Sequence, residues 1–320
     1  MEIRFILGAA CACMFLAVDM GSSMANTEKL GLKIVGGPVR EPGMLRLMHG
    51  PKGPVALVSQ TVTVALGAET DFRALELSHG GDWRSLTKIQ ALVPAMPAWD
   101  AAPQNGHVDI VYELAGGALN ALILLAPPAA PVSITAAYPA NNFAKPRFAK
   151  MHAGSPRWVT AILESKTCVA LPVPRSGKYH VLADCADGLL LADGPGYTFL
   201  YKVDLPGAAR GIATLPGSLH LQSLDAQLQP VGKPVDVSKE KIFEFDAEIR
   251  DHTLILLATT STGCFVAVRN NGSAGVTFRV NDYAAPPTLV SPALMALSPA
   301  KSIIAALDSG KLVVAEHANP

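Results

Sequence analysis

The stretch Arg46-Leu-Met-His-Gly-Pro-Lys-Gly-Pro-Val-Ala-Leu-Val58 decides the fold prediction, because it reads as a strand, a tight turn and a second strand. The same order recurs in Phe148-Ala-Lys-Met-His-Ala-Gly-Ser-Pro-Arg-Trp-Val-Thr-Ala-Ile-Leu163 and in Leu294-Met-Ala-Leu-Ser-Pro-Ala-Lys-Ser-Ile-Ile-Ala-Ala-Leu307. A looser version joins 108–117 to 118–125. Repeated strand-turn-strand units are typical of folds in which each unit packs on its neighbours.

Outside these units, short apolar runs with β-branched residues are separated by Gly, Pro, Asn and Asp, and helical periodicity is almost absent. The pattern predicts strands over Gly53–Val64, Val108–Leu114, Ala121–Leu125, Trp158–Leu163, Lys178–Leu182, Tyr197–Val203, Ser218–Leu224, Lys241–Phe245, Thr253–Leu257, Cys264–Arg269, Val276–Val280, Ile303–Leu307 and Lys311–Ala315. Turn pairs such as Asp187-Gly188, Asp193-Gly194 and Asn271-Gly272 bound several of them. Many short strands indicate an all-β sandwich, barrel or propeller.

Three segments resemble parts of known β-propellers. The unit Ala296–Val314 is similar to a blade of the WD40 or TolB-like propellers, with Lys301 where that family's turn has Gly. His220–Val235 resembles an outer hairpin of a blade, with an Asp-led turn. Phe72–Trp83 resembles a degenerate Asp-box of the sialidase-like propellers, since it keeps Ser78, a Gly and Trp83 but is shorter than the family turn.

The predicted fold is therefore an all-β propeller of five to seven blades, with about 40 to 50 residues in each. In a closed ring, we expect the N-terminal strand near residues 31–47 to lie beside the C-terminal strand near 311–315, which would cover both edges. The alternative is two β-sandwich domains that meet near the Pro-rich stretch 126–131.

The N-terminus is typical of a secretory signal peptide. A charged start, Met1-Glu-Ile-Arg4, precedes an apolar run from Phe5 to Val18 and then the exit Ser23-Met-Ala25. The run is shorter than the roughly 20 residues that span a bilayer. We expect cleavage after Ala25, one propeller domain over 26–320, and export to the periplasm or the extracellular space without membrane insertion.

The charge balance excludes one class of partner. The chain has 26 Lys plus Arg and 26 Asp plus Glu, and loss of residues 1–25 leaves it near neutral. Nucleic-acid binders carry a basic excess or cluster, so no nucleic-acid partner is expected. Cys168 and Cys185 flank an expected hairpin and could form a disulfide, whereas Cys264 would stay free; the alternative is that all three are buried thiols.

The eight histidines include no His-x-His or His-x-x-x-His pair, so the sequence predicts no metal site. No nucleotide-binding or Gly-x-Ser-x-Gly motif occurs either, and no cofactor is predicted. A glycosidase needs two carboxylates facing one pocket. No spacing selects a pair among the candidates Asp109, Glu113, Glu164, Asp204, Glu244, Asp246 and Glu248.

Flat aromatic and imidazole side chains near predicted turns are the remaining candidates for recognition. They are Trp83, Trp99, Trp158, His49 and His152, with blade packing as the alternative for the tryptophans. The sequence thus favours an exported propeller that binds a protein or glycan through the loops on one face. A secreted, sialidase-like glycan-cleaving hydrolase is the alternative.

Overall fold

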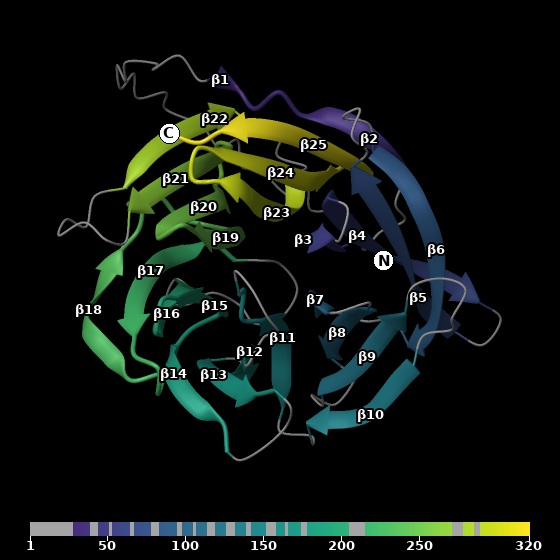
Figure 1. Ribbon diagram of the computed structural model, residues 1–320, viewed down its shortest axis with the longest axis horizontal. Coiled ribbons are helices and arrows are strands. Elements are labelled where there is room, and N and C mark those ends of the chain that lie inside the picture. Colours follow the sequence, from purple (N-terminus) through teal and green to yellow (C-terminus); the bar gives the residue numbers. More distant parts are fainter. Residues whose placement is uncertain are drawn as a thin grey trace, which may run out of the picture.

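The computed structural model is a ring of β-sheets (Figure 1). It describes residues 28–38, 44–50, 53–64, 67–77, 83–94, 98–104, 107–113, 119–125, 132–138, 142–151, 158–163, 166–173, 178–204, 215–270, 278–284 and 289–320. The strands in these ranges form six sheets, which we number as blades 1 to 6. The chain is therefore a β-propeller, as predicted.

In each blade, antiparallel strands follow chain order from the axis outward, and the N-terminal strands β1 and β2 are added at the outer edges of two blades. Blade 1 contains β3 (Met44–Gly50), β4 (Gly53–Val64), β5 (Gly67–Leu77) and β6 (Trp83–Pro94). Blade 2 contains β7 (Trp99–Gln104), β8 (His107–Glu113), β9 (Leu119–Leu125) and β10 (Val132–Tyr138). Blade 3 contains β11 (Phe143–Phe148), β12 (Trp158–Leu163), β13 (Thr167–Pro172) and β14 (His180–Asp184).

Blade 4 contains β15 (Asp187–Asp193), β16 (Gly196–Asp204), β17 (Gly217–Leu224) and β18 (Pro230–Asp236). Blade 5 contains β19 (Phe245–Arg250), β20 (Thr253–Thr259), β21 (Cys264–Asn270) and β22 (Arg279–Ala284), and β1 (Glu28–Lys29) pairs in parallel with β22. Blade 6 contains β23 (Leu289–Ser298), β24 (Lys301–Asp308), β25 (Lys311–Ala318) and the N-terminal β2 (Lys33–Pro38).

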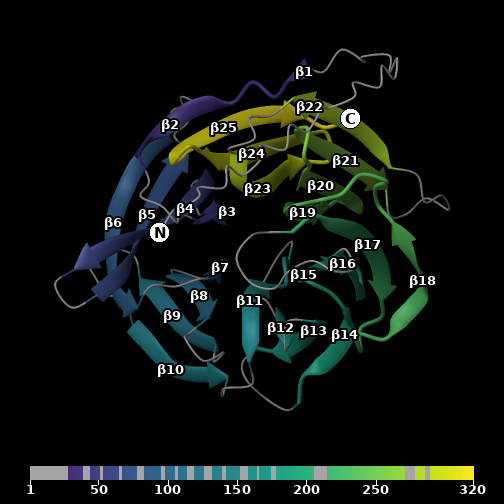
Figure 2. The same cartoon turned by 180° about the vertical axis from the view of Figure 1, so that it is seen from behind.

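The ring is closed by strands from opposite ends of the chain. β2 pairs antiparallel with β25, with Lys33 opposite Val314 and Ile34 opposite Val313, and both views show β2 outside β25 (Figures 1 and 2). The expected pairing of the N-terminal and C-terminal strands is confirmed. The three repeated units 44–58, 147–163 and 294–307 are also equivalent, because each holds the first hairpin of its blade.

The apolar core lies between blades rather than in one central mass. β20 shows why: all seven of its residues are buried, and alternate side chains point to opposite faces. Leu254 and Leu256 pack against blade 4, whereas Ile255 and Leu257 pack against blade 6. An apolar cluster of this kind fills each of the six junctions. Burying each Leu or Ile contributes about 1.5–3 kcal/mol, so every blade depends on both neighbours.

Two strand predictions are misplaced. The predicted strand 241–245 ends where β19 begins, since Phe245 is the first residue of β19. Residues 241–244 instead link blades 4 and 5, and Ile242 forms an isolated bridge with Gly217. The predicted strand 276–280 begins before β22, which starts at Arg279. The outer hairpin His220–Val235 is confirmed as β17 and β18, where Asp225 Oδ1 accepts the main-chain N–H groups of Gln227 and Gln229.

Candidate functional site

The first strand of each blade lines the axis of the ring, and these six strands bring a set of charged side chains together. The strands are β3, β7, β11, β15, β19 and β23. The charged side chains are Arg46, His49, Asp100, Arg147, Lys150, Asp187, Asp246 and Glu248. Four of them, Asp100, Arg147, Asp246 and Glu248, are buried, so these four need hydrogen-bond or ionic partners to remain charged.

Two aspartates connect consecutive blades in the same way. Asp100, the second residue of β7, accepts the main-chain N–H of Phe148 in β11 at 2.7 Å and also the guanidinium of Arg46. Asp246, the second residue of β19, accepts the main-chain N–H of Leu294 in β23 at 2.8 Å. In both cases a carboxylate satisfies the N–H of the next blade's innermost strand, where no sheet partner is present. These aspartates hold neighbouring blades together.

Asp246 also connects blades that are not consecutive. Its Oδ1 lies 2.9 Å from Arg147 Nη2 and 2.6 Å from Lys150 Nζ, both from blade 3. Burial alone would raise the pKa of Asp246, but the charges of Lys150 and Arg147 outweigh burial and lower it. Burial alone would lower the pKa of Arg147, but the carboxylates of Asp187 and Asp246 raise it. Asp246 and Arg147 therefore both stay charged at neutral pH.

Glu248 makes a further contact between three blades. Its Oε2 accepts the main-chain N–H of Ala296 in blade 6 at 2.8 Å, and its Oε1 lies 3.0 Å from Nε2 of His49 in blade 1. His49 is half-exposed at the end of β3, whereas Glu248 is almost buried. The predicted binding residue His49 thus contributes to the joint between blades and still presents an edge to solvent.

A third connection uses residues with a left-handed backbone. Lys145 and Ser291 have φ angles of 47° and 53°, and each precedes a proline at a bulge in an innermost strand. Their main-chain N–H groups point to the preceding blade, where Glu113 accepts from Lys145 at 3.2 Å and Glu244 from Ser291 at 2.7 Å. Burial raises the pKa of Glu113 above its ordinary value. Left-handed non-glycine residues persist only where surrounding contacts fix them, as these carboxylates do.

Four of the seven carboxylates that the sequence nominated for glycoside hydrolysis therefore have other partners. Glu113, Glu244, Asp246 and Glu248 each accept a main-chain N–H of a neighbouring blade. A catalytic acid or base must instead reach the substrate's proton. The four groups act in blade-to-blade attachment in this structure.

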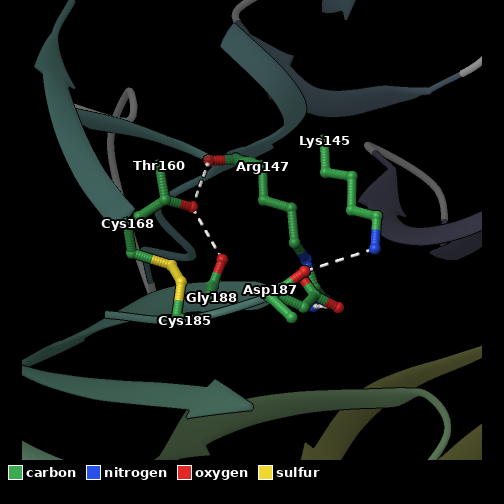
Figure 3. The surroundings of a disulfide bond; sticks show 8 residues. Lys145, Arg147, Thr160, Cys168, Cys185, Asp187 and Gly188 are labelled. Carbon is green, nitrogen blue, oxygen red and sulfur yellow. Dashed lines mark hydrogen bonds and ion pairs between the residues drawn. A yellow bond between two sulfur atoms is a disulfide. The ribbon is translucent and has the colours of Figure 1, made fainter. Parts of the chain in front are cut away.

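Cys168 and Cys185 form a disulfide, and their Cα atoms lie 5.5 Å apart. Figure 3 shows its surroundings at the junction of blades 3 and 4. Cys168 lies in β13 and Cys185 directly follows its antiparallel partner β14, so the bond closes this hairpin of blade 3, as expected, where the chain passes on to blade 4. Nearby, Thr160 Oγ1 donates to Gly188 O at 2.8 Å, and Arg147 lies 3.7 Å from Asp187. Cys264 is free and buried.

The binding role predicted for Trp99 is wrong. Its side chain is fully buried and packs edge-to-face on Phe72 at 5.0 Å, while Arg46 lies over its ring. Its Nε1–H donates to Ser59 Oγ at 2.8 Å. The residue begins β7, so its ring points into the junction of blades 1 and 2, and a ligand has no access to it. Trp99 therefore packs between two blades, which is the alternative to a binding role.

The other predicted residues that the structure describes share one side of the ring. The innermost strands of the blades run parallel to one another, as the parallel bridge between Lys150 and Leu191 shows. In every blade, the connection from the first to the second strand and the connection from the third to the fourth strand therefore lie on the same side of the ring. We call this side the turn face. His49 ends β3 there, Trp158 begins β12 and Trp83 begins β6. Trp158 is half-buried and lies edge-to-face with exposed His180 at 5.2 Å. His152 lies outside the described residues.

Sequence reasoning missed Asp100 and considered Asp246 only as a catalytic candidate, although a signal for their shared blade-connecting role was present. Trp99-Asp100-Ala101 and Phe245-Asp246-Ala247 share an aromatic-Asp-Ala order at the start of an innermost strand. The two copies are far apart in the chain, and no strand was predicted over 99–104. Their equivalence becomes visible only once both segments are placed at the axis.

The protein is thus a β-propeller whose blades are connected by axial carboxylates. Comparisons with known proteins support the fold alone. The sequence matches no protein-family model and no curated protein. A mutant of the Aleuria aurantia lectin AAL, in complex with Fucα1-6GlcNAc, matches with a TM-score of 0.58 and 9% identity over 88% of this chain and 97% of that chain. The BP39L lectin from Burkholderia pseudomallei matches with a TM-score of 0.51 and 15% identity, over the same shares.

An α-L-arabinofuranosidase from Clostridium thermocellum matches with a TM-score of 0.44 and 9% identity, over 84% of this chain and 83% of that chain, which is too low to support an argument. In the described ranges, no group of three or more His, Cys, Asp or Glu side chains is arranged to hold a metal ion. No helix in those ranges is long and apolar enough to cross a membrane.

Proposed function

We propose that this chain is an exported binding propeller that recognises a glycan or protein partner through its turn face. The observation that carries the proposal is the position of Trp158. Its half-buried ring, supported edge-to-face by His180, offers an apolar surface with a polar rim on the face that also carries His49. Aromatic rings with one exposed side are typical of recognition surfaces. Propeller lectins with the same fold support a glycan as the partner.

The use of the axial carboxylates also favours binding over glycan cleavage. Each of the nominated carboxylates Glu113, Glu244, Asp246 and Glu248 holds a main-chain N–H group of an adjacent blade. Removing Asp246 or Glu248 from this role would leave a buried N–H unpaired, which costs about 1–3 kcal/mol.

The test is an immobilised glycan panel probed with residues 26–320 and with Trp158→Ala. We expect the wild type to retain a subset of glycans and the variant to lose them, because the stacking surface is removed. The matched control is Val290→Ala, an exposed apolar residue at the opposite end of an innermost strand. Retention that is equal for wild type and Trp158→Ala, with unchanged melting temperatures, would contradict the proposal.

A further inference from the structure

A row of four residues crosses blade 4 from the axis to its outer edge. Gly188, Tyr201, His220 and Asp236 lie directly opposite one another on β15, β16, β17 and β18. Residues in direct register on adjacent strands share one face of the sheet. None of the four is among the predicted binding residues, and none belongs to the turn face.

The rings in this row form a column that begins in the core and ends in solvent. Phe199 is buried and stacks on Tyr201 at 5.0 Å with an interplanar angle of 14°. His220 stacks on Tyr201 at 5.3 Å and 30°. The imidazole is 23% exposed, and Asp236 beyond it is 83% exposed. The buried base of the column fixes the orientation of the exposed rings.

At the exposed end of the row, the polar side chains have fixed orientations but still have atoms available for hydrogen bonds to a ligand. His220 Nδ1 lies 2.8 Å from Asp236 Oδ1, which fixes the imidazole ring. Within the described part of the chain, no partner is found for the Tyr201 hydroxyl, His220 Nε2 or Asp236 Oδ2. Burial, and then the negative charge of Asp236, raise the pKa of Tyr201, so its hydroxyl remains a donor at neutral pH. The row thus offers one hydroxyl, one imidazole nitrogen and one carboxylate oxygen beside a ring surface.

We propose that this row on blade 4 is a binding site for an uncharged saccharide. A sugar ring presents C–H groups to an aromatic surface and hydroxyl groups to acceptors at its rim, which are the two features that His220 and Asp236 supply together. The carboxylate of Asp236 repels an acidic ligand and accepts hydrogen bonds from sugar hydroxyls. The site is separate from the turn face, so it stands whether or not Trp158 binds a ligand.

The experiment titrates residues 26–320 with methyl glycosides of neutral hexoses and deoxyhexoses, with the matching uronic acids and with a primary alkylamine. Calorimetry measures affinity, and the imidazole proton resonances of His220 report occupancy of this site. We expect at least one neutral glycoside to bind in the millimolar range and to shift those resonances. The uronic acid should bind at least tenfold more weakly than its neutral parent, because its carboxylate meets Asp236.

Variants then assign the site. His220→Ala should weaken the neutral glycoside at least tenfold, and Tyr201→Phe and Asp236→Asn several-fold each, whereas Gln227→Ala, an exposed residue of the same blade, should have no effect. Trp158→Ala should leave this binding unchanged. If no neutral glycoside shifts the His220 resonances, if the amine or the uronic acid binds more tightly, or if His220→Ala binds normally, the proposal is overturned. If Trp158→Ala were the only variant to lose glycoside binding, the ligand would be bound at the turn face, and the proposed site on blade 4 would be overturned.

Discussion

At the scale of single residues, Asp246 shows how charge is used in this ring. It accepts from the Leu294 N–H, from Arg147 and from Lys150, which belong to blades 6 and 3. Removing one member of a buried ionic cluster leaves the charges of the other members without a partner. We expect Asp246→Asn to lower the free energy of unfolding at neutral pH by about 3 kcal/mol, measured by urea denaturation.

The stability difference between wild type and Asp246→Asn should also depend on pH. The pKa of Asp246 is lowered in the folded protein, so its stabilisation is present above the unfolded value of about 3.9 and disappears as the pH falls from there through the folded value. The difference between wild type and Asp246→Asn should therefore shrink in strong acid. Exposed Asp184→Asn is the control, with a change within about 0.5 kcal/mol. Equal stability of Asp246→Asn and wild type at pH 7 would contradict this role.

Cys264 gives a second prediction at this scale. Burial, with a contribution from Asp282, raises the pKa of its thiol to about 11. Because the thiolate is the reactive form, iodoacetamide at pH 8 should leave Cys264 unmodified in the folded protein and alkylate it after denaturation. Mass spectrometry of the peptides measures both states. Rapid labelling of the native protein would show that the thiol is accessible.

At the scale of elements, the junction of blades 3 and 4 is connected by several independent contacts. The disulfide, the Thr160 hydroxyl and the Arg147–Asp187 pair all reach residues 185–188 from blade 3 (Figure 3). Gly188 is packed so closely that an added Cβ would lie 2.7 Å from Cys168 Sγ. The segment that passes from blade 3 to blade 4 is thus attached to blade 3 by a covalent bond, a hydrogen bond and an ion pair.

We expect the double variant Cys168→Ser/Cys185→Ser to lose about 3 kcal/mol of stability, since a disulfide closing a loop of this length contributes about that much. Thermal denaturation measures the change, and Cys264→Ser is the control. Non-reducing peptide mapping of the wild type should link Cys168 to Cys185 and leave Cys264 free. Three thiols that are all alkylated in a folded, never-reduced sample would remove the disulfide.

Elements also show what the sequence could and could not predict. Strands β4 and β12 agree residue for residue with the predicted ranges, because both are rich in apolar and β-branched residues. Strands β7 and β15 were missed, since an innermost strand faces the axis and carries Asp, Gly and Gln beside its apolar residues. Trp99 was placed at a binding surface because alternation alone does not say which side of a strand meets the next blade.

At the scale of the whole molecule, closure of the ring makes the two chain ends interdependent. β25 lies between β24 and β2, so deleting residues 311–320 removes the partner of both. We expect the deletion to lower the melting temperature of the entire domain in one cooperative transition, because an opened ring exposes the clusters on both sides of blade 6. Calorimetry measures it. A truncated protein with the wild-type melting temperature would contradict the dependence.

Export remains a prediction for the whole chain. Mass spectrometry of protein recovered from outside the cytoplasm should give an N-terminus at or near Asn26, because the apolar run and the Ser23-Met-Ala25 exit are typical of signal peptidase substrates. Recovery of a mature form that still carries Phe5 would contradict it. The first described strand begins at Glu28, so cleavage at this point would leave β1 and β2 intact.

The pairing of β2 with β25 also sets an order of events during synthesis. Lys33 leaves the ribosome early, but its partner Val314 is made only after the strands of blades 1 to 5. Contacts this distant in sequence are slow to form, and the sheet of blade 6 cannot be completed on a nascent chain. We therefore expect the chain to stay open, and so able to pass through a narrow translocation pore, until its last strand has been made.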